Sequence, residues 1–93
     1  MRTVERERWA AEIRSGRLNA KLTQAQLAQL LVDRAAAAGS QIAVRQADVS
    51  DWENGVRLPN DHLKGDLIRV LSIEPSKVAP EWLKPLLRRQ QVA

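Results

Sequence analysis

The chain of 93 residues contains no cysteine, and this absence removes several classes of function at once. Disulfide bonds, thiolate metal sites and thiol catalysis all require that residue. A single histidine, His62, is too little for a zinc site of the usual kind. No nucleophile–base pair can be built, and the carboxylates do not cluster in an acid/base or magnesium pattern. We therefore expect neither an enzyme nor a protein that holds a metal or another cofactor.

Aromatic residues and long apolar runs are also scarce. The chain has three tryptophans and no Phe or Tyr, whereas a platform for single-stranded nucleic acid needs several exposed aromatic side chains. No apolar run approaches the roughly 18 residues of a membrane span, and no signal-peptide pattern opens the chain. These absences predict a cytoplasmic protein that does not cross a membrane.

The residues that are abundant carry positive charge or favour helices. Fifteen Lys and Arg against eleven Asp and Glu give a formal net charge of +4. This excess favours a polyanionic partner, either nucleic acid or an acidic membrane surface. The length suits one small domain rather than two. Ala, Leu, Arg, Gln and Glu are strong helix formers, and strand signals are nearly absent.

Apolar periodicity and capping residues divide the chain into helices. The first should bury Trp9 and Ile13, with Leu18 beside them, and the third should bury Trp52. Thr23 suits the start of the second helix, and Gly39 its end. The third helix has a less certain start, because Arg45 is a poor capping residue and the nearest upstream hydroxyl is that of Ser40. We predict an all-α fold of five to six helices over about residues 3–20, 23–38, 45–54, 60–71, 75–79 and 81–90.

Two segments, taken together, carry the functional information. The first is LTQAQLAQLL, residues 22–31, and the second is VSDWENGVRLP, residues 49–59. With an Arg in the preceding helix, their order resembles the Cro/repressor-type (Xre) helix-turn-helix family over about residues 10–73. The resemblance implies a lambda-repressor-like DNA-binding domain, here residues 1–79, followed by a C-terminal helix and tail, 80–93. It departs from the family in one place: Ala28 and Val49 lie 21 positions apart, which leaves an insertion at about 33–44.

The resemblance also implies roles for single residues. The start of the second helix is a natural anion site, because its first N–H groups have no partner inside the helix. Family members bind the DNA backbone at this helix start and at the loop after the third helix. In the same family an Arg of the first helix pairs with the Glu of the Trp-Glu motif, here Arg17 and Glu53, and fixes orientation. The expected phosphate-binding residues are Thr23, Gln24, Asn54, the Gly55 backbone and Arg57.

Helical geometry then selects the residues that would read bases. If Val49, Trp52 and Glu53 face inward, Ala47, Ser50 and Asp51 face outward, and Arg45 and Gln46 project at the helix start. In helix-turn-helix proteins such positions enter the major groove. Arg45 suits guanine, Gln46 adenine, Ala47 a thymine methyl group and Asp51 the amino group of cytosine. Asp51 would also repel nearby phosphates, and Asp48 and Asp51 could instead simply be solvated.

We predict a sequence-specific regulator of transcription that binds double-stranded DNA, most simply a homodimeric repressor on an inverted repeat. The helix at 81–90 either mediates dimerisation or covers the core of its own chain, through Trp82, Leu83, Leu86 and Leu87. One alternative is an antitoxin, whose toxin partner would bind the insertion or the C-terminal helix. Another is a protein-interaction module that has lost DNA binding, which Asp48 and Asp51 favour.

Overall fold

A computed structural model describes residues 4–78, and these residues form five helices and no strand. The helices are α1 (Val4–Asn19), α2 (Gln24–Ala37), α3 (Gln46–Glu53), α4 (Asp61–Leu71) and α5 (Pro75–Val78). The expected all-α fold is confirmed, and each of these helices begins and ends within one or two residues of its predicted position. The helix expected at 81–90 lies outside the described residues. None of the helices within 4–78 combines the length and the apolar composition needed to cross a lipid bilayer.

Short-range chemistry sets the helix ends. Gly39 and Gly55 adopt positive φ angles of 83° and 70°, which a residue without Cβ tolerates. At α2, the Gly39 amide donates to the carbonyl of Ala36, and the next amide, that of Ser40, donates to Ala35. The same pair of bonds closes α3, where the Gly55 amide donates to the carbonyl of Trp52 at 3.2 Å. Both ends are therefore Schellman motifs, as the glycine positions predict.

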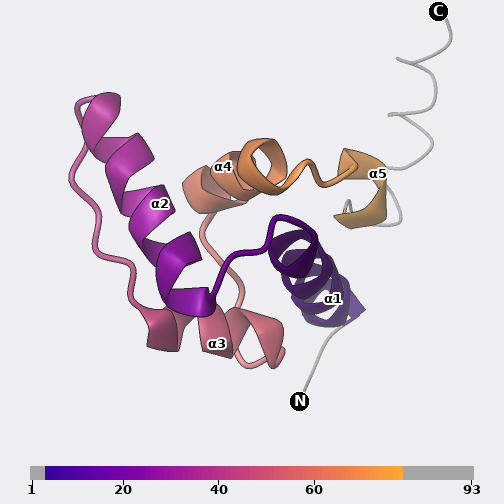
Figure 1. The fold of residues 1–93 in the computed structure, drawn as a ribbon. Coiled ribbons are helices and arrows are strands. Elements are labelled where there is room, and N and C mark those ends of the chain that lie inside the picture. The colour runs from indigo at the N-terminus through magenta and orange to yellow at the C-terminus, as the bar shows by residue number, and fades with distance from the viewer. Residues whose placement is uncertain (1–3, 79–93) are drawn as a thin grey trace, which may run out of the picture.

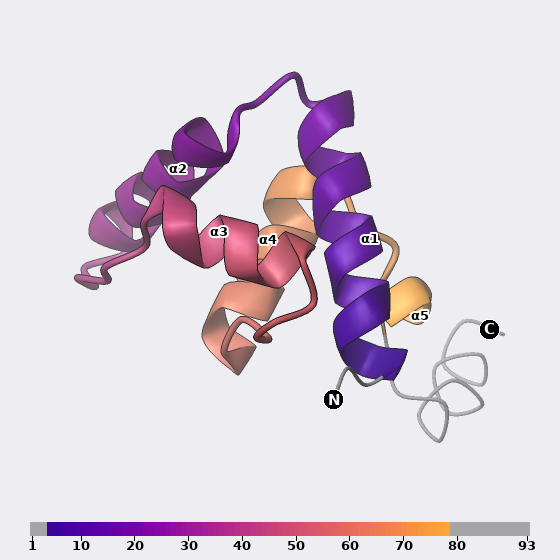
Figure 2. The ribbon, with the colours of Figure 1, turned by 90° about the horizontal axis from the view of Figure 1, so that it is seen from below.

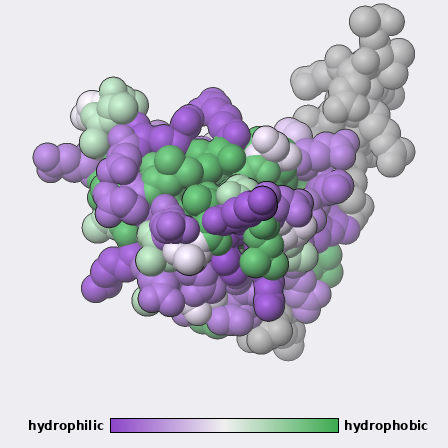
Figure 3. Space-filling model, in the orientation of Figure 1, coloured by the Kyte–Doolittle hydropathy of each residue, from purple (hydrophilic) through white to green (hydrophobic). Residues whose placement is uncertain are grey.

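The core lies where the helices meet. Trp9 and Ile13 of α1 are buried against Leu27 and Leu31 of α2 and Leu67 of α4, within one apolar cluster. Figure 2 shows α3 lying between α1 and α2, with α4 behind. Figure 3 shows apolar side chains gathered on the face between α2 and α4, with polar side chains over most of the remainder of that view.

The packing of α1 determines the surroundings of Leu18 and Gly16. Leu18, expected beside the core stripe, is instead 56% exposed. The expectation was wrong because the stripe follows the spacing of four between Trp9, Ile13 and Arg17, and one further residue turns by about 100° away from it. Gly16 faces α4 so closely that a Cβ atom on it would lie 2.8 Å from the Cβ of Leu71.

The insertion lengthens α2 and then returns along it. Figure 1 shows α2 and the following segment side by side, so that the chain comes back toward the start of α2 before α3 begins. Val44 is buried, and Ile42 packs against the same core cluster. Ala35, in the added part of α2, is also buried. Both arms of the excursion therefore remain attached to the domain.

Candidate nucleic-acid interface

Helix α3 has one buried side and one exposed side. Val49 and Trp52 are buried, with relative exposures of 0% and 4%. Arg45, which precedes the helix, and Gln46 and Ala47 at its start are exposed. Ser50 and Asp51 are half-buried on the same exposed side. The structure therefore brings the expected base-reading residues to one edge of the domain.

The start of α3 is fixed by an acid rather than by a hydroxyl. Arg45 has an extended backbone, with φ −118° and ψ 167°, and its N–H donates to Asp48 Oδ2 at 2.9 Å. This hydrogen bond is the largest cause that lowers the pKa of Asp48, followed by the hydrogen bond from Arg57. The helix begins at Gln46 and not upstream near Ser40, because an acid at the third helical position satisfies the amide that precedes the helix. Asp48 was the sequence signal for this start.

The start of α2 is a capping box with free amides beside it. Thr23 Oγ1 accepts a hydrogen bond from the Gln26 amide at 3.0 Å, and Gln26 Oε1 accepts one from the Thr23 amide at 2.9 Å. Within residues 4–78, the amides of Gln24 and Ala25 have no hydrogen-bond partner. Such amides, with the positive end of the helix dipole, attract anions.

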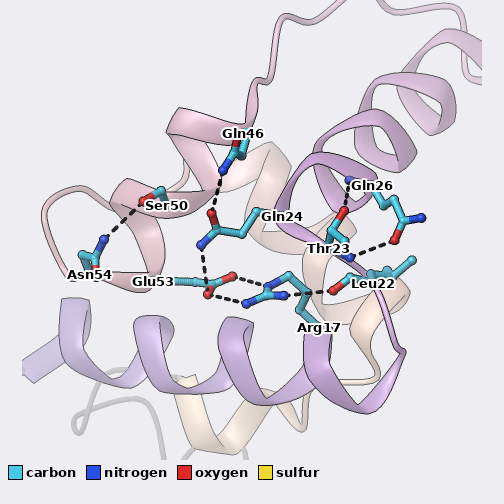
Figure 4. A network of polar contacts seen from close by, with 9 residues as sticks. All are labelled: Arg17, Leu22, Thr23, Gln24, Gln26, Gln46, Ser50, Glu53 and Asn54. Atoms are coloured by element: carbon cyan, nitrogen blue, oxygen red, sulfur yellow. Dashed lines mark hydrogen bonds and ion pairs between the residues drawn. The ribbon is translucent and has the colours of Figure 1, made fainter.

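A chain of polar contacts joins the starts of α2 and α3 to α1 (Figure 4). Gln46 Nε2 donates to Gln24 Oε1, and Gln24 Nε2 donates to Glu53 Oε1, both at 3.3 Å. The two glutamines are the first residues of their helices. The helix starts border one open hollow, lined by Arg17, Lys21, Leu22, Thr23, Gln24 and Gln46 among others. Gln24 therefore connects the start of α2 to both ends of α3, besides lying where a phosphate contact was expected.

The expected ion pair between Arg17 and Glu53 ends this chain of contacts. Arg17 Nε donates to Glu53 Oε2 at 2.6 Å, and Nη2 donates to Oε1 at 3.0 Å, so the contact is bidentate. Arg17 Nη1 also donates to the carbonyl of Leu22 at 2.9 Å. The side chains are only 12% and 4% exposed, and their hydrogen bonds raise the pKa of Arg17. The pair holds α1, the start of α2 and the end of α3 in one arrangement.

Arg57 is already occupied by two carboxylates. Its Nη2 lies 2.6 Å from Asp48 Oδ1 and 3.1 Å from Asp51 Oδ2, and its Nε donates to Asp51 Oδ2 at 3.2 Å. The hydrogen bond to Asp48 is the largest cause that raises the pKa of Arg57. Sequence reasoning placed Arg57 on phosphates and treated both acids as possibly solvated. It missed this contact because the loop after α3 folds back along the helix.

Asn54 and Gly55, the other residues expected to bind phosphates, already make hydrogen bonds within the domain. Asn54 is exposed, and its Nδ2 donates to Ser50 Oγ at 3.2 Å, which leaves one amide hydrogen available. Gly55 is buried, and its amide closes the end of α3. This amide is therefore not free to contact a phosphate, which corrects the expectation for Gly55. The dimer candidates Trp82, Leu83, Leu86 and Leu87 lie outside the described residues.

Comparison of the chain with models of known families, with curated proteins and with solved structures found no match. The geometry of this edge of the domain is therefore the basis for assigning a function. Among residues 4–78 it combines two helix starts, an exposed first turn of α3 and the partly engaged side-chain amides of Gln24, Gln46 and Asn54.

Proposed function

We propose that the chain is a transcriptional regulator that binds double-stranded DNA, with α3 in the major groove and the start of α2 against the phosphate backbone. The observation that carries the proposal is the hydrogen bond between Gln24 and Gln46, the first residues of α2 and α3. It brings two positive helix ends together at one surface hollow. The helix-turn-helix resemblance of the two segments supports the same function.

The free groups at this edge suit the chemistry of a duplex. The unpartnered amides at the start of α2 match phosphate oxygens. Gln46 donates one amide hydrogen to Gln24, and its Oε1 and its other N–H are not used in that bond. These two groups can bind adenine, with Oε1 accepting from N6 and the N–H donating to N7. Arg45 is exposed and makes no ion pair within residues 4–78, so its guanidinium is available for guanine. Lys21, beside the hollow, is a further cation that makes no ion pair with any residue from 4 to 78.

A homodimeric repressor is the simplest form of this proposal. Two copies of the chain would place two α3 helices in successive turns of the major groove, about 34 Å apart. An operator read in this way is an inverted repeat. Symmetry in the selected DNA therefore tests the dimer separately from DNA binding itself.

The test is selection of binding sites from random duplex DNA at two salt concentrations. Enrichment of a consensus at low salt supports the proposal, and a palindromic consensus supports the dimer. No enrichment at low salt would refute both. Gln46→Ala should relax the preference at one base pair, at a cost of about 1–3 kcal/mol. The matched control is Gln41→Ala, because Gln41 is an exposed glutamine of the loop before α3 and its side chain makes no hydrogen bond within the described residues.

One observation favours a second candidate, a protein-interaction module. The acids Asp48, Asp51 and Glu53 offset most of the positive charge on this edge. A surface with little net charge attracts a duplex weakly. If Arg45→Ala combined with Gln46→Ala leaves the fold intact and binding to all DNA unchanged, this second candidate is favoured over the first.

A further inference from the structure

The most unusual feature of the candidate interface is the cluster of Asp48, Asp51 and Arg57. It consists of two carboxylates and one guanidinium, joined by contacts of 2.6 Å and 3.1 Å. It lies at the side of α3, beside the expected base-reading residues, and its side chains are 21%, 40% and 55% exposed in the order given. One cation shared between two anions leaves a net negative charge where a DNA backbone would have to approach.

The loop after α3 builds this cluster through its backbone. The amides of Val56 and Arg57 both point to the carbonyl oxygen of Asp51, at 2.9 Å and 3.5 Å. Gly55 makes the reversal of direction with its positive φ angle, and Pro59 is buried at the far end of the loop. The fold of the loop therefore places the backbone of Arg57 beside α3, within reach of both acids.

Asp48 and Asp51 differ in the hydrogen bonds that they accept. Asp48 also accepts the hydrogen bond from the Arg45 amide and so belongs to the start of α3. Within residues 4–78, the side chain of Asp51 makes hydrogen bonds and ion pairs only with Arg57. It is also more exposed than the side chain of Asp48. Asp51 is therefore the acid that can leave Arg57 without disturbing the helix. A carboxylate on the exposed side of a groove-binding helix accepts a hydrogen bond from the amino group of cytosine.

We propose that Asp51 determines specificity by controlling whether Arg57 is available to a DNA phosphate. This inference rests on the proposed function. On a sequence without an amino group opposite Asp51, the acid keeps Arg57 and repels the backbone. On a sequence that presents a cytosine amino group, Asp51 turns to the base. Arg57 then keeps its 2.6 Å contact with Asp48, and its Nε–H, which had donated to Asp51, becomes free to pair with a phosphate. The contact cluster thus weakens binding to unrelated DNA and couples a base contact to a backbone contact.

A cycle of four proteins tests this coupling: the wild type, Asp51→Asn, Arg57→Gln and the double variant. Each is titrated with a random duplex and with the selected consensus duplex at several salt concentrations. The control is Asp33→Asn, because it removes the same charge from an exposed acid of α2 that contacts only Gln29. Circular dichroism and thermal unfolding establish that each variant is folded.

Asp51→Asn should bind the random duplex roughly tenfold more tightly, with a salt slope steeper by about 0.9 because one more phosphate is neutralised. Its preference for the consensus should fall by roughly fivefold, because the neutral amide oxygen of Asn is a weaker acceptor for the cytosine amino group than a carboxylate oxygen. The gain on random DNA should vanish in the Arg57→Gln background, and Asp33→Asn should leave both affinities nearly unchanged.

Three results would overturn the inference while leaving the proposed function standing. The first is an equal shift in affinity for Asp51→Asn and Asp33→Asn, which would mean that net charge alone acts. The second is a gain of Asp51→Asn that persists without Arg57, which would mean that Asp51 only repels phosphates. The third is no change in either affinity for Asp51→Asn. If neither the wild type nor Asp51→Asn binds any duplex at low salt, the proposed function fails, and this inference fails with it.

Discussion

Neutralising Glu53 should destabilise the whole domain, because this carboxylate of α3 accepts hydrogen bonds from two other helices, α1 and α2. It accepts two hydrogen bonds from Arg17 of α1 and one from Gln24 of α2, while itself ending α3. Glu53→Gln retains the size of the side chain and one carbonyl oxygen. It replaces the other oxygen with an NH₂ group that points at a guanidinium, and it leaves the charge of Arg17 without a partner.

The burial of the pair sets the magnitude of this effect. Breaking a fully buried ion pair costs about 3–5 kcal/mol, because the remaining charge stays desolvated. Breaking an exposed pair costs about 0.2–1 kcal/mol. Glu53 is 4% exposed and Arg17 is 12% exposed, so the value should lie near the first range. Allowing for the oxygen that glutamine keeps, we expect about 2–4 kcal/mol.

Urea unfolding followed by tryptophan fluorescence measures this change, since Trp9 and Trp52 are both buried. The matched control is Glu5→Gln, because Glu5 is 40% exposed and pairs with Lys64 at 3.3 Å. The control should cost less than about 1 kcal/mol. A loss for Glu53→Gln as small as that of the control would refute the reasoning. The double variant Arg17→Met with Glu53→Met should recover part of the loss, because it removes the unpaired charge.

Four other predictions concern stability. Gly16→Ala should destabilise, because a Cβ only 2.8 Å from that of Leu71 costs about 1–3 kcal/mol, more than the roughly 1 kcal/mol that alanine adds to a helix. Gly65→Ala, with nothing within 4 Å of the added atom, should stabilise by about 0.5–1 kcal/mol; thermal unfolding of both variants separates packing from propensity. Thr23→Ala removes the α2 cap and should cost about 1 kcal/mol in urea unfolding, whereas no loss would show that the capping box does not act. The folded-state pKa of Asp48 is lowered, so its contribution to stability is present above about pH 4 and is lost as the pH falls through that lowered pKa. Asp48→Asn should therefore flatten the loss of stability in an acid titration, and an unchanged titration would contradict this.

The candidate site could be predicted in part. The pairing of Arg17 with Glu53 and the exposure of Arg45, Gln46 and Ala47 were expected from the motif and from helical periodicity. The partners of Arg57 were not expected, because its contact with Asp48 spans a helix end and a loop reversal. The engagement of the Gly55 amide was likewise missed, although its role in ending α3 was foreseen.

The sequence by itself determined the helices and their ends, because those depend on interactions between residues three to five positions apart. The capping of Thr23 by Gln26 and the positive φ angles of Gly39 and Gly55 are examples of such local chemistry. Only the tertiary structure decided which polar groups stay free at the candidate interface. Gln24 meets Gln46 across 22 positions, because the insertion returns along α2 and sets α3 beside its start. No local pattern encodes that path, since it depends on how the buried faces of α1, α2 and α3 pack together.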